Sequence, residues 1–80
     1  MSSKLSRAEY DFCMNQKDLS GSFMKSLFTT IFSADTQNLF KLSQGYPDLI
    51  EVVLRYRNES GYWGDLKKRW NEEYPHSEFQ

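Results

Sequence analysis

The sequence predicts an all-α protein, a compact bundle of four or five short helices in a single domain. Three observations lead to this fold class: apolar residues recur at helical spacing, helix-capping residues precede those segments, and glycine or proline follows them. A chain of 80 residues has room for one domain only. We place that domain at residues 1–75 and expect residues 76–80, beyond Pro75, to form a flexible C-terminal tail.

The first helix is expected to start directly after Ser6. Ser6 and Glu9 have the spacing of a capping box, in which the hydroxyl and the carboxylate each accept a hydrogen bond from the other residue's backbone N–H. Leu5 and Tyr10 flank this box at the positions of a hydrophobic staple. The helical pattern ends near residues 17–18.

The second helix carries the clearest pattern. A break at residues 20–22 precedes it, and its apolar residues then recur on one face. These are Phe23, Met24, Leu27, Phe28, Ile31 and Phe32. We expect this helix and the one over 49–56 to form the centre of the bundle, with Phe28 as a main support of the core.

The third and fourth helices are delimited by single residues. Asp35 is placed to cap the third helix and Gly45 to end it, while Pro47 suits the first position of the fourth. The β-branched residues 52–53 would also suit a strand. Opposite charges four residues apart favour a helix there: Glu51, Arg55 and Glu59.

The last helix follows the break at Gly61 and ends at Pro75. Its apolar face consists of Trp63, Leu66, Trp70 and Tyr74. A stripe at this spacing is usually packing, so we expect Trp63 and Trp70 in the core, with a role in an interface as the alternative. Aromatic residues make up 16% of the chain, and their burial has to stabilise a domain that cannot form a disulfide.

Composition argues against several classes of protein. Ten basic and eleven acidic residues give a net charge of −1, which provides no long-range attraction to phosphate or to an acidic membrane. The chain has no apolar run long enough to span a membrane, and Met1 to Lys4 do not resemble a signal peptide. We therefore expect a cytoplasmic protein that does not bind membranes.

An enzymatic function is not expected. Cys13 is the only cysteine and His76 the only histidine, so no zinc motif is present. Cys13 lies among apolar residues within a helix and His76 lies in the tail, which leaves no nucleophile with a base in reach. The glycines form no phosphate-binding loop. The sequence predicts no catalytic residues, no metal and no cofactor.

Two short motifs carry a resemblance to known proteins. Gly45-Tyr46-Pro47, and Arg55-Tyr56-Arg57-Asn58-Glu59 running into Gly61-Tyr62-Trp63, resemble small uncharacterised helical proteins encoded by bacterial phages and integrative mobile elements. The resemblance covers about residues 22–70 and leaves out the first helix. It implies an accessory protein of a mobile element and no particular activity.

The favoured function is non-catalytic protein binding that would modulate a host or element protein. Trp, Tyr and Arg are enriched at the energetic centres of interfaces, and the last third of the chain is rich in them. The residues expected to be exposed and to contact an unknown protein partner are Arg55, Arg57, Tyr62 and Tyr74.

Two alternatives remain. Lys67, Lys68 and Arg69 form a basic run that could bind nucleic acid, although acidic residues alternate with it along the same helix. The chain could also form a structural homo-oligomer that covers surplus aromatic surface.

Overall fold

Five helices make up the fold, and the computed structural model describes residues 4–79. Residues 1–3 of the predicted domain and residue 80 of the predicted tail lie outside the described residues. The helices are α1 (Arg7–Gln16), α2 (Ser22–Ser33), α3 (Thr36–Gly45), α4 (Pro47–Asn58) and α5 (Tyr62–Glu73). Residues 4–79 contain no strand, which confirms the predicted all-α bundle.

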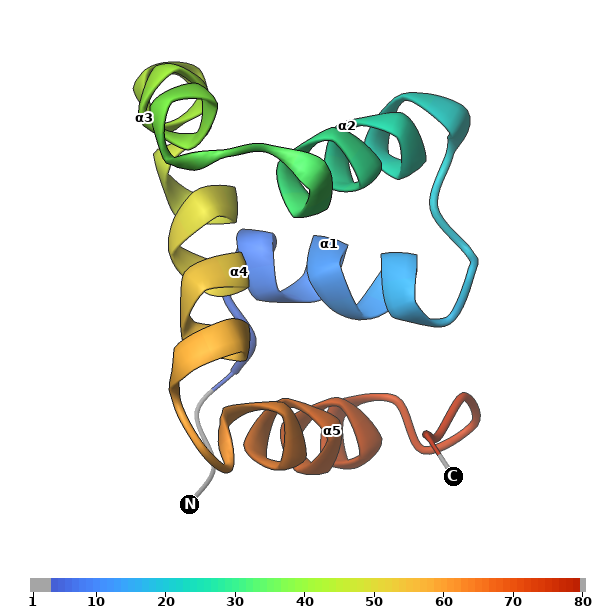
Figure 1. Cartoon of the computed structure of the whole chain (residues 1–80). Helices are drawn as coiled ribbons and strands as arrows, with labels where there is room; N and C mark the ends of the chain where they lie inside the picture. Colours follow the sequence, from blue (N-terminus) through green and yellow to red (C-terminus); the bar gives the residue numbers. More distant parts are fainter. Residues whose placement is uncertain (1–3, 80) are drawn as a thin grey trace.

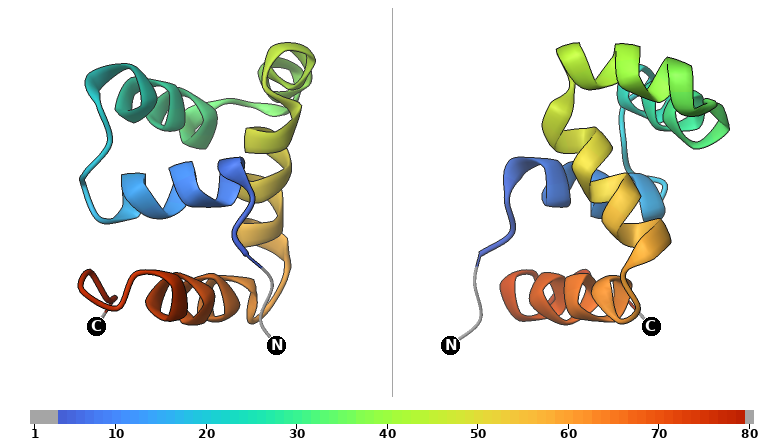
Figure 2. Two further views of the ribbon diagram at one scale, coloured as in Figure 1. Left: turned by 180° about the vertical axis from the view of Figure 1, so that it is seen from behind. Right: turned by 60° about the vertical axis from the view of Figure 1, so that its left-hand side comes forward.

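Helix α1 occupies the centre of the bundle. It lies between α2 and α5, and α4 crosses the ends of these three helices (Figure 1). The views in Figure 2 show α3 at the far end of α4, away from α5. We expected α2 and α4 at the centre, and for α2 this was wrong. The polar residues of α1 weakened its apolar pattern, yet Phe12 and Cys13 are fully buried.

The predicted helix starts are confirmed at three positions. The backbone N–H of Glu9 donates to Ser6 Oγ (3.1 Å), and the N–H of Ser6 donates to Glu9 Oε1 (3.0 Å), which completes the capping box. Asp35 caps α3 by accepting from the N–H of Asn38 (2.8 Å). Pro47 is the first residue of α4. These signals are local, so the sequence alone was enough to find them.

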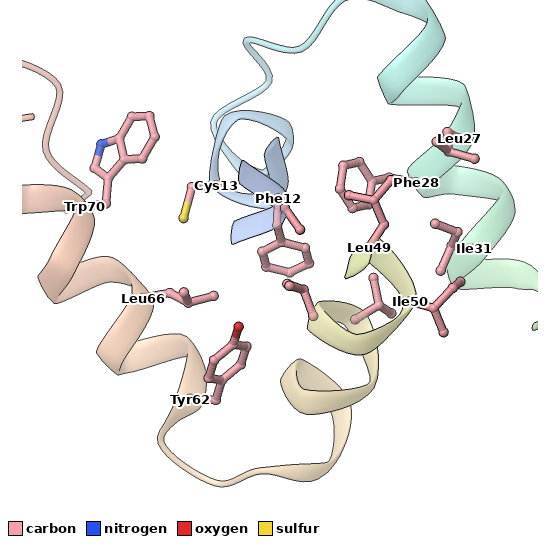
Figure 3. Packing of buried hydrophobic residues seen from close by; sticks show 13 residues of the cluster. Phe12, Cys13, Leu27, Phe28, Ile31, Leu49, Ile50, Tyr62, Leu66 and Trp70 are labelled. Atoms are coloured by element: carbon pink, nitrogen blue, oxygen red, sulfur yellow. The ribbon is translucent and has the colours of Figure 1, made fainter. Parts of the chain in front are cut away.

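The core is formed by the inner faces of α1, α2, α4 and α5 (Figure 3). The ring of Phe12 packs edge-on against Phe28 (centroids 5.8 Å apart) and against Trp63 (5.7 Å). Phe28 is fully buried and Trp70 is 2% exposed, whereas Trp63 is partly buried against the same cluster. The expected core positions of Phe28 and Trp70 are therefore confirmed.

The first turn of α2 departs from its predicted role. Phe23 lies on the predicted apolar stripe, but its side chain is 64% exposed. This turn lies at the end of α2 farthest from α4 (Figure 1). The later residues of the stripe, Leu27, Phe28 and Ile31, are the ones that pack in the core.

Residues 77–79 fold back onto the helices, although we assigned them to a flexible tail. The indole Nε1–H of Trp70 donates to Ser77 O (2.7 Å), and the ring of Phe79 lies 5.1 Å from that of Trp63. No pattern in the sequence indicates these contacts, because they depend on how the chain turns back onto α5 after the turn at residues 75–76. Mobility of the segment stays a prediction.

No helix within residues 4–79 has the length and apolar character required to cross a bilayer.

Candidate docking groove on helix α4

Arg69, which we considered for nucleic-acid binding, is held in the interior by Glu9. Its Nη1 and Nη2 donate to the two carboxylate oxygens of Glu9, at 3.0 and 2.8 Å, and its Nε donates to Asp65 Oδ2 (2.9 Å). The Arg69 and Glu9 side chains are only 12% and 10% exposed. A phosphate would have to displace this pair, so Arg69 does not share an open basic surface with its neighbours Lys67 and Lys68.

Tyr62, which we expected to be exposed, is buried at 4% exposure. Its hydroxyl donates to Glu9 Oε2 (2.8 Å), and Figure 3 shows its ring directed from the start of α5 into the core. The expectation was wrong because the acceptor comes from α1, 53 positions away in the chain. Tyr62 supports the core and does not contact solvent broadly.

The environment of Glu9 keeps it ionised. Burial raises the pKa of this carboxyl, but hydrogen bonds from Arg69, from the Ser6 N–H and from Tyr62 outweigh burial and lower the pKa to about 2. The same burial and the hydrogen bond to Glu9 raise the pKa of Tyr62 above its usual value. Glu9 therefore stays ionised and Tyr62 stays protonated over a wide pH range, which suits a structural role better than acid–base chemistry.

The other two predicted contact residues lie at separate places. Arg57 donates from Nη2 to Phe32 O (2.6 Å), a carbonyl in the last turn of α2, and its guanidinium lies 5.5 Å from the ring centroid of Phe32. Tyr74 is half-buried beside Trp70, with ring centroids 4.4 Å apart. The four predicted residues therefore do not form one surface.

Of the four residues predicted to contact a protein partner, Arg55 is the one that lines a groove on α4. Its guanidinium covers the ring of Tyr62 at 4.1 Å and pairs with Glu59 through contacts of 2.8 and 3.2 Å. Its side chain remains 41% exposed. Burial of Tyr62 thus supports Arg55 from beneath, and the pair with Glu59 holds the guanidinium at the rim of the groove.

The groove runs along the outward face of α4 and measures about 350 Å³. It is lined by Pro47, Ile50, Glu51, Leu54, Arg55, Asn58 and Glu59. Most of the atoms that its wall exposes are apolar, and the Leu54 side chain is 38% exposed although it is large and apolar. The sequence indicated an apolar outer face, since apolar residues occupy more than one face of α4. We took it as a sign of a central helix, whereas one of those faces is open.

The remaining basic candidates, Lys67 and Lys68, line a second groove of about 510 Å³ on α5. The ammonium of Lys67 lies 5.6 Å from the ring centroid of Trp63. Glu72 and Glu78 line the same groove, so its charges are mixed. A phosphate backbone would meet both signs of charge there.

Catalytic and metal sites receive no support from the described geometry. Within residues 4–79, no three His, Cys, Asp or Glu side chains are grouped as metal ligands would be. Cys13 is fully buried, and burial raises the pKa of its thiol to about 12, with a smaller contribution from Glu9. Such a thiol is protonated at neutral pH and is a poor nucleophile.

Comparison of the chain with protein-family models, with curated proteins and with solved structures finds no match.

Proposed function

We propose that this chain is a non-catalytic protein-binding module that docks a partner protein along α4. The observation that carries the proposal is the open, mainly apolar groove that is lined by the exposed Leu54 and the partly exposed Arg55. Interfaces commonly combine an apolar centre with a polar rim. Helix α4, which has 12 residues, supplies nearly all of the lining, so the groove is about as long as this helix. A groove of this length can hold a short segment of a partner protein but not a large flat surface.

The charges around the groove favour protein over nucleic acid. Arg55 is neutralised by Glu59, and Glu51 adds a negative charge on the same face. A phosphate backbone would be repelled by this rim, whereas a peptide can place a basic side chain near Glu51. An arginine stacked on a tyrosine is also a rigid contact residue, because little side-chain freedom remains to be lost on binding.

The proposed setting follows the resemblance described above. An accessory protein of a phage or integrative element would act in the cytoplasm of its host, by binding a host protein or another protein of the element. Neither a cofactor nor a chemical step is part of this proposal.

The test is affinity capture with a matched pair of variants. Leu54→Glu places a charge in the wall of the groove, while Leu19→Glu places the same charge on a leucine in the loop before α2 that is 54% exposed, against 38% for Leu54. We expect the wild type and Leu19→Glu to recover the same partner and Leu54→Glu to lose it. A partner that Leu54→Glu retains would place the interface elsewhere.

The two alternatives have their own readouts. Loss of binding in Lys67→Ala/Lys68→Ala, with a steep dependence on salt, would indicate nucleic acid bound at the second groove. A molecular mass of two or more chains in light scattering, reduced by Leu54→Glu, would mean that the α4 groove binds another copy of this chain.

A further inference from the structure

Residues 77–79 are held mainly by side chains of α5 and by one residue that follows α1. Trp70 Nε1–H donates to Ser77 O (2.7 Å), and Lys17 Nζ donates to Glu78 O (3.2 Å). Asn71 bonds both backbone groups of Phe79, since Phe79 N–H donates to Asn71 Oδ1 (2.7 Å) and Asn71 Nδ2 donates to Phe79 O (3.4 Å). All four hydrogen bonds go to main-chain atoms, so they hold the backbone of the segment without selecting its side chains.

One side chain of the segment is recognised. The ring of Phe79 packs edge-on against Trp63 (centroids 5.1 Å apart) and Trp70 (5.9 Å), and Lys17 Nζ lies 4.5 Å from its centroid. Phe79 therefore fills a pocket with aromatic walls and a positive charge over one face. Main-chain hydrogen bonds combined with one side-chain pocket are the usual means by which proteins bind extended peptides.

The charges of the surrounding groove do not add a second selection. Lys67 and Lys68 line the groove that continues along α5, together with Glu72 and Glu78. Because both signs of charge are present, the side chain that the site recognises is the aromatic one.

We propose that the seam between α1 and α5 is a binding site for a short peptide of a partner protein, one that carries an aromatic residue, and that residues 77–79 occupy this site in cis. The occupant present in the structure shows which chemistry the site accepts. The site is separate from the α4 groove and does not depend on the function proposed for it.

Because residues 77–79 of the same chain already occupy the site, an added peptide has to compete with them. A tethered segment competes at an effective concentration on the order of millimolar. A short peptide in solution will therefore bind measurably only after the chain's own segment has been weakened. Phe79→Ala does this in the full-length chain, because it removes the ring from its pocket and leaves the pocket residues intact.

The probe is a blocked synthetic peptide with the sequence of residues 75–79, and the readout is the NMR signal of the Trp70 indole N–H. We expect Phe79→Ala to shift this signal and the peptide, at concentrations on the order of millimolar, to return it toward its wild-type position. A peptide with alanine in place of phenylalanine should have no such effect. Phe40→Ala, which truncates a phenylalanine 67% exposed on α3, is the matched control and should leave the signal unchanged.

A second substitution tests the main-chain contacts. Asn71→Leu in the Phe79→Ala background keeps the side-chain size but cannot bond a peptide backbone, and we expect peptide affinity to fall about tenfold or more. The proposal is overturned if Phe79→Ala leaves the Trp70 signal in place, or if the peptide fails to restore it. If Phe79→Ala lowers the content of folded protein, Phe79→Leu replaces it. The same two results are then required: a shift of the Trp70 signal and its restoration by the peptide. Leu54→Glu should not alter peptide binding, so this site and the α4 groove can fail separately.

Discussion

Arg69 and Glu9 lie 60 positions apart in the chain and face each other through two parallel hydrogen bonds of 2.8 and 3.0 Å. The pair connects α5 to the first turn of α1. Glu9 also closes the capping box with Ser6 and accepts from Tyr62, so one carboxylate joins helix initiation to tertiary packing. Because the pair is nearly buried, removal of one partner leaves a charge that water cannot solvate.

Arg69→Ala is therefore expected to destabilise the protein by about 3–5 kcal/mol. Urea unfolding at neutral pH measures this loss. The control is Lys25→Ala, which breaks the pair between Lys25 and Asp18; that pair is equally short (2.8 Å) but its side chains are 61% and 76% exposed. An exposed pair contributes little to stability because water screens the two charges, so the control should remain close to the wild type. Equal losses in the two variants would contradict the structural role of the Glu9–Arg69 pair.

Acid should weaken the same interaction. The pKa of Glu9 is about 2 in the folded chain and has an ordinary value of 4.5, so the unfolded chain takes up the proton first as pH falls. The resulting stabilisation is complete above about pH 4.5, decreases below it, and is lost once pH falls through about 2; it amounts to at most about 3 kcal/mol. Urea unfolding at about pH 6 and about pH 2.5 compares the two regimes.

Glu9→Gln is the control for this pH dependence. It removes the titrating group, while other carboxylates such as Asp18 and Glu59, whose pKa values are lowered by Lys25 and Arg55, still titrate. The variant should be less stable at neutral pH and should lose less stability on acidification than the wild type. An identical loss in both proteins would assign the acid sensitivity to other groups.

The sequence predicted those features that depend on neighbouring residues. The Ser6 capping box, the Asp35 cap and the start of α4 at Pro47 each involve side chains and backbone groups within one turn of a helix. The core position of Phe28 followed from spacing along one helix. Such local patterns keep their meaning in any fold in which the helix forms.

The candidate sites were predicted much less well, because they depend on contacts between distant segments. Tyr62 and Arg69 are polar and look exposed in a sequence, but both bond to Glu9 from another helix. Leu54 looks like a core residue by its spacing, yet no helix covers that face of α4. Phe79 follows a proline near the chain end, where nothing in the local pattern indicates a pocket.

Two phenylalanines on α2 provide a test of the core. Phe28 is fully buried, so Phe28→Ala should cost about 3–5 kcal/mol and leave little folded protein in a domain of this size. Phe23→Ala makes the same chemical change on the same helix, but its side chain is 64% exposed, so the loss should be below about 1 kcal/mol. Thermal unfolding followed by circular dichroism distinguishes the two. A melting temperature of Phe28→Ala close to that of the wild type would contradict the packing described here for α2.

Cys13 should be unreactive in the folded protein. Burial raises its pKa to about 12, so the thiolate is a negligible fraction near neutral pH. A thiol reagent such as dithionitrobenzoate is expected to react only as fast as the chain opens, and at once in urea. Rapid reaction of the folded protein would mean that α1 is not buried as the structure has it. For the same reason we expect Cys13→Ser and His76→Ala to retain whatever binding the protein has, provided that they fold.

The last prediction concerns which cations contact a partner. Arg55 lies in the α4 groove, so Arg55→Ala should weaken partner binding by about 1–2 kcal/mol, while Lys67→Ala and Lys68→Ala should leave it unchanged. Tyr62 is buried and Tyr74 half-buried, so truncating either should act through stability first. Titration calorimetry of the folded variants at low and moderate salt checks both points, since binding to an apolar centre depends only weakly on salt. If affinity falls steeply with salt and responds to the lysines but not to Arg55, the partner is an anionic polymer bound along α5, and the α4 groove is not the functional surface.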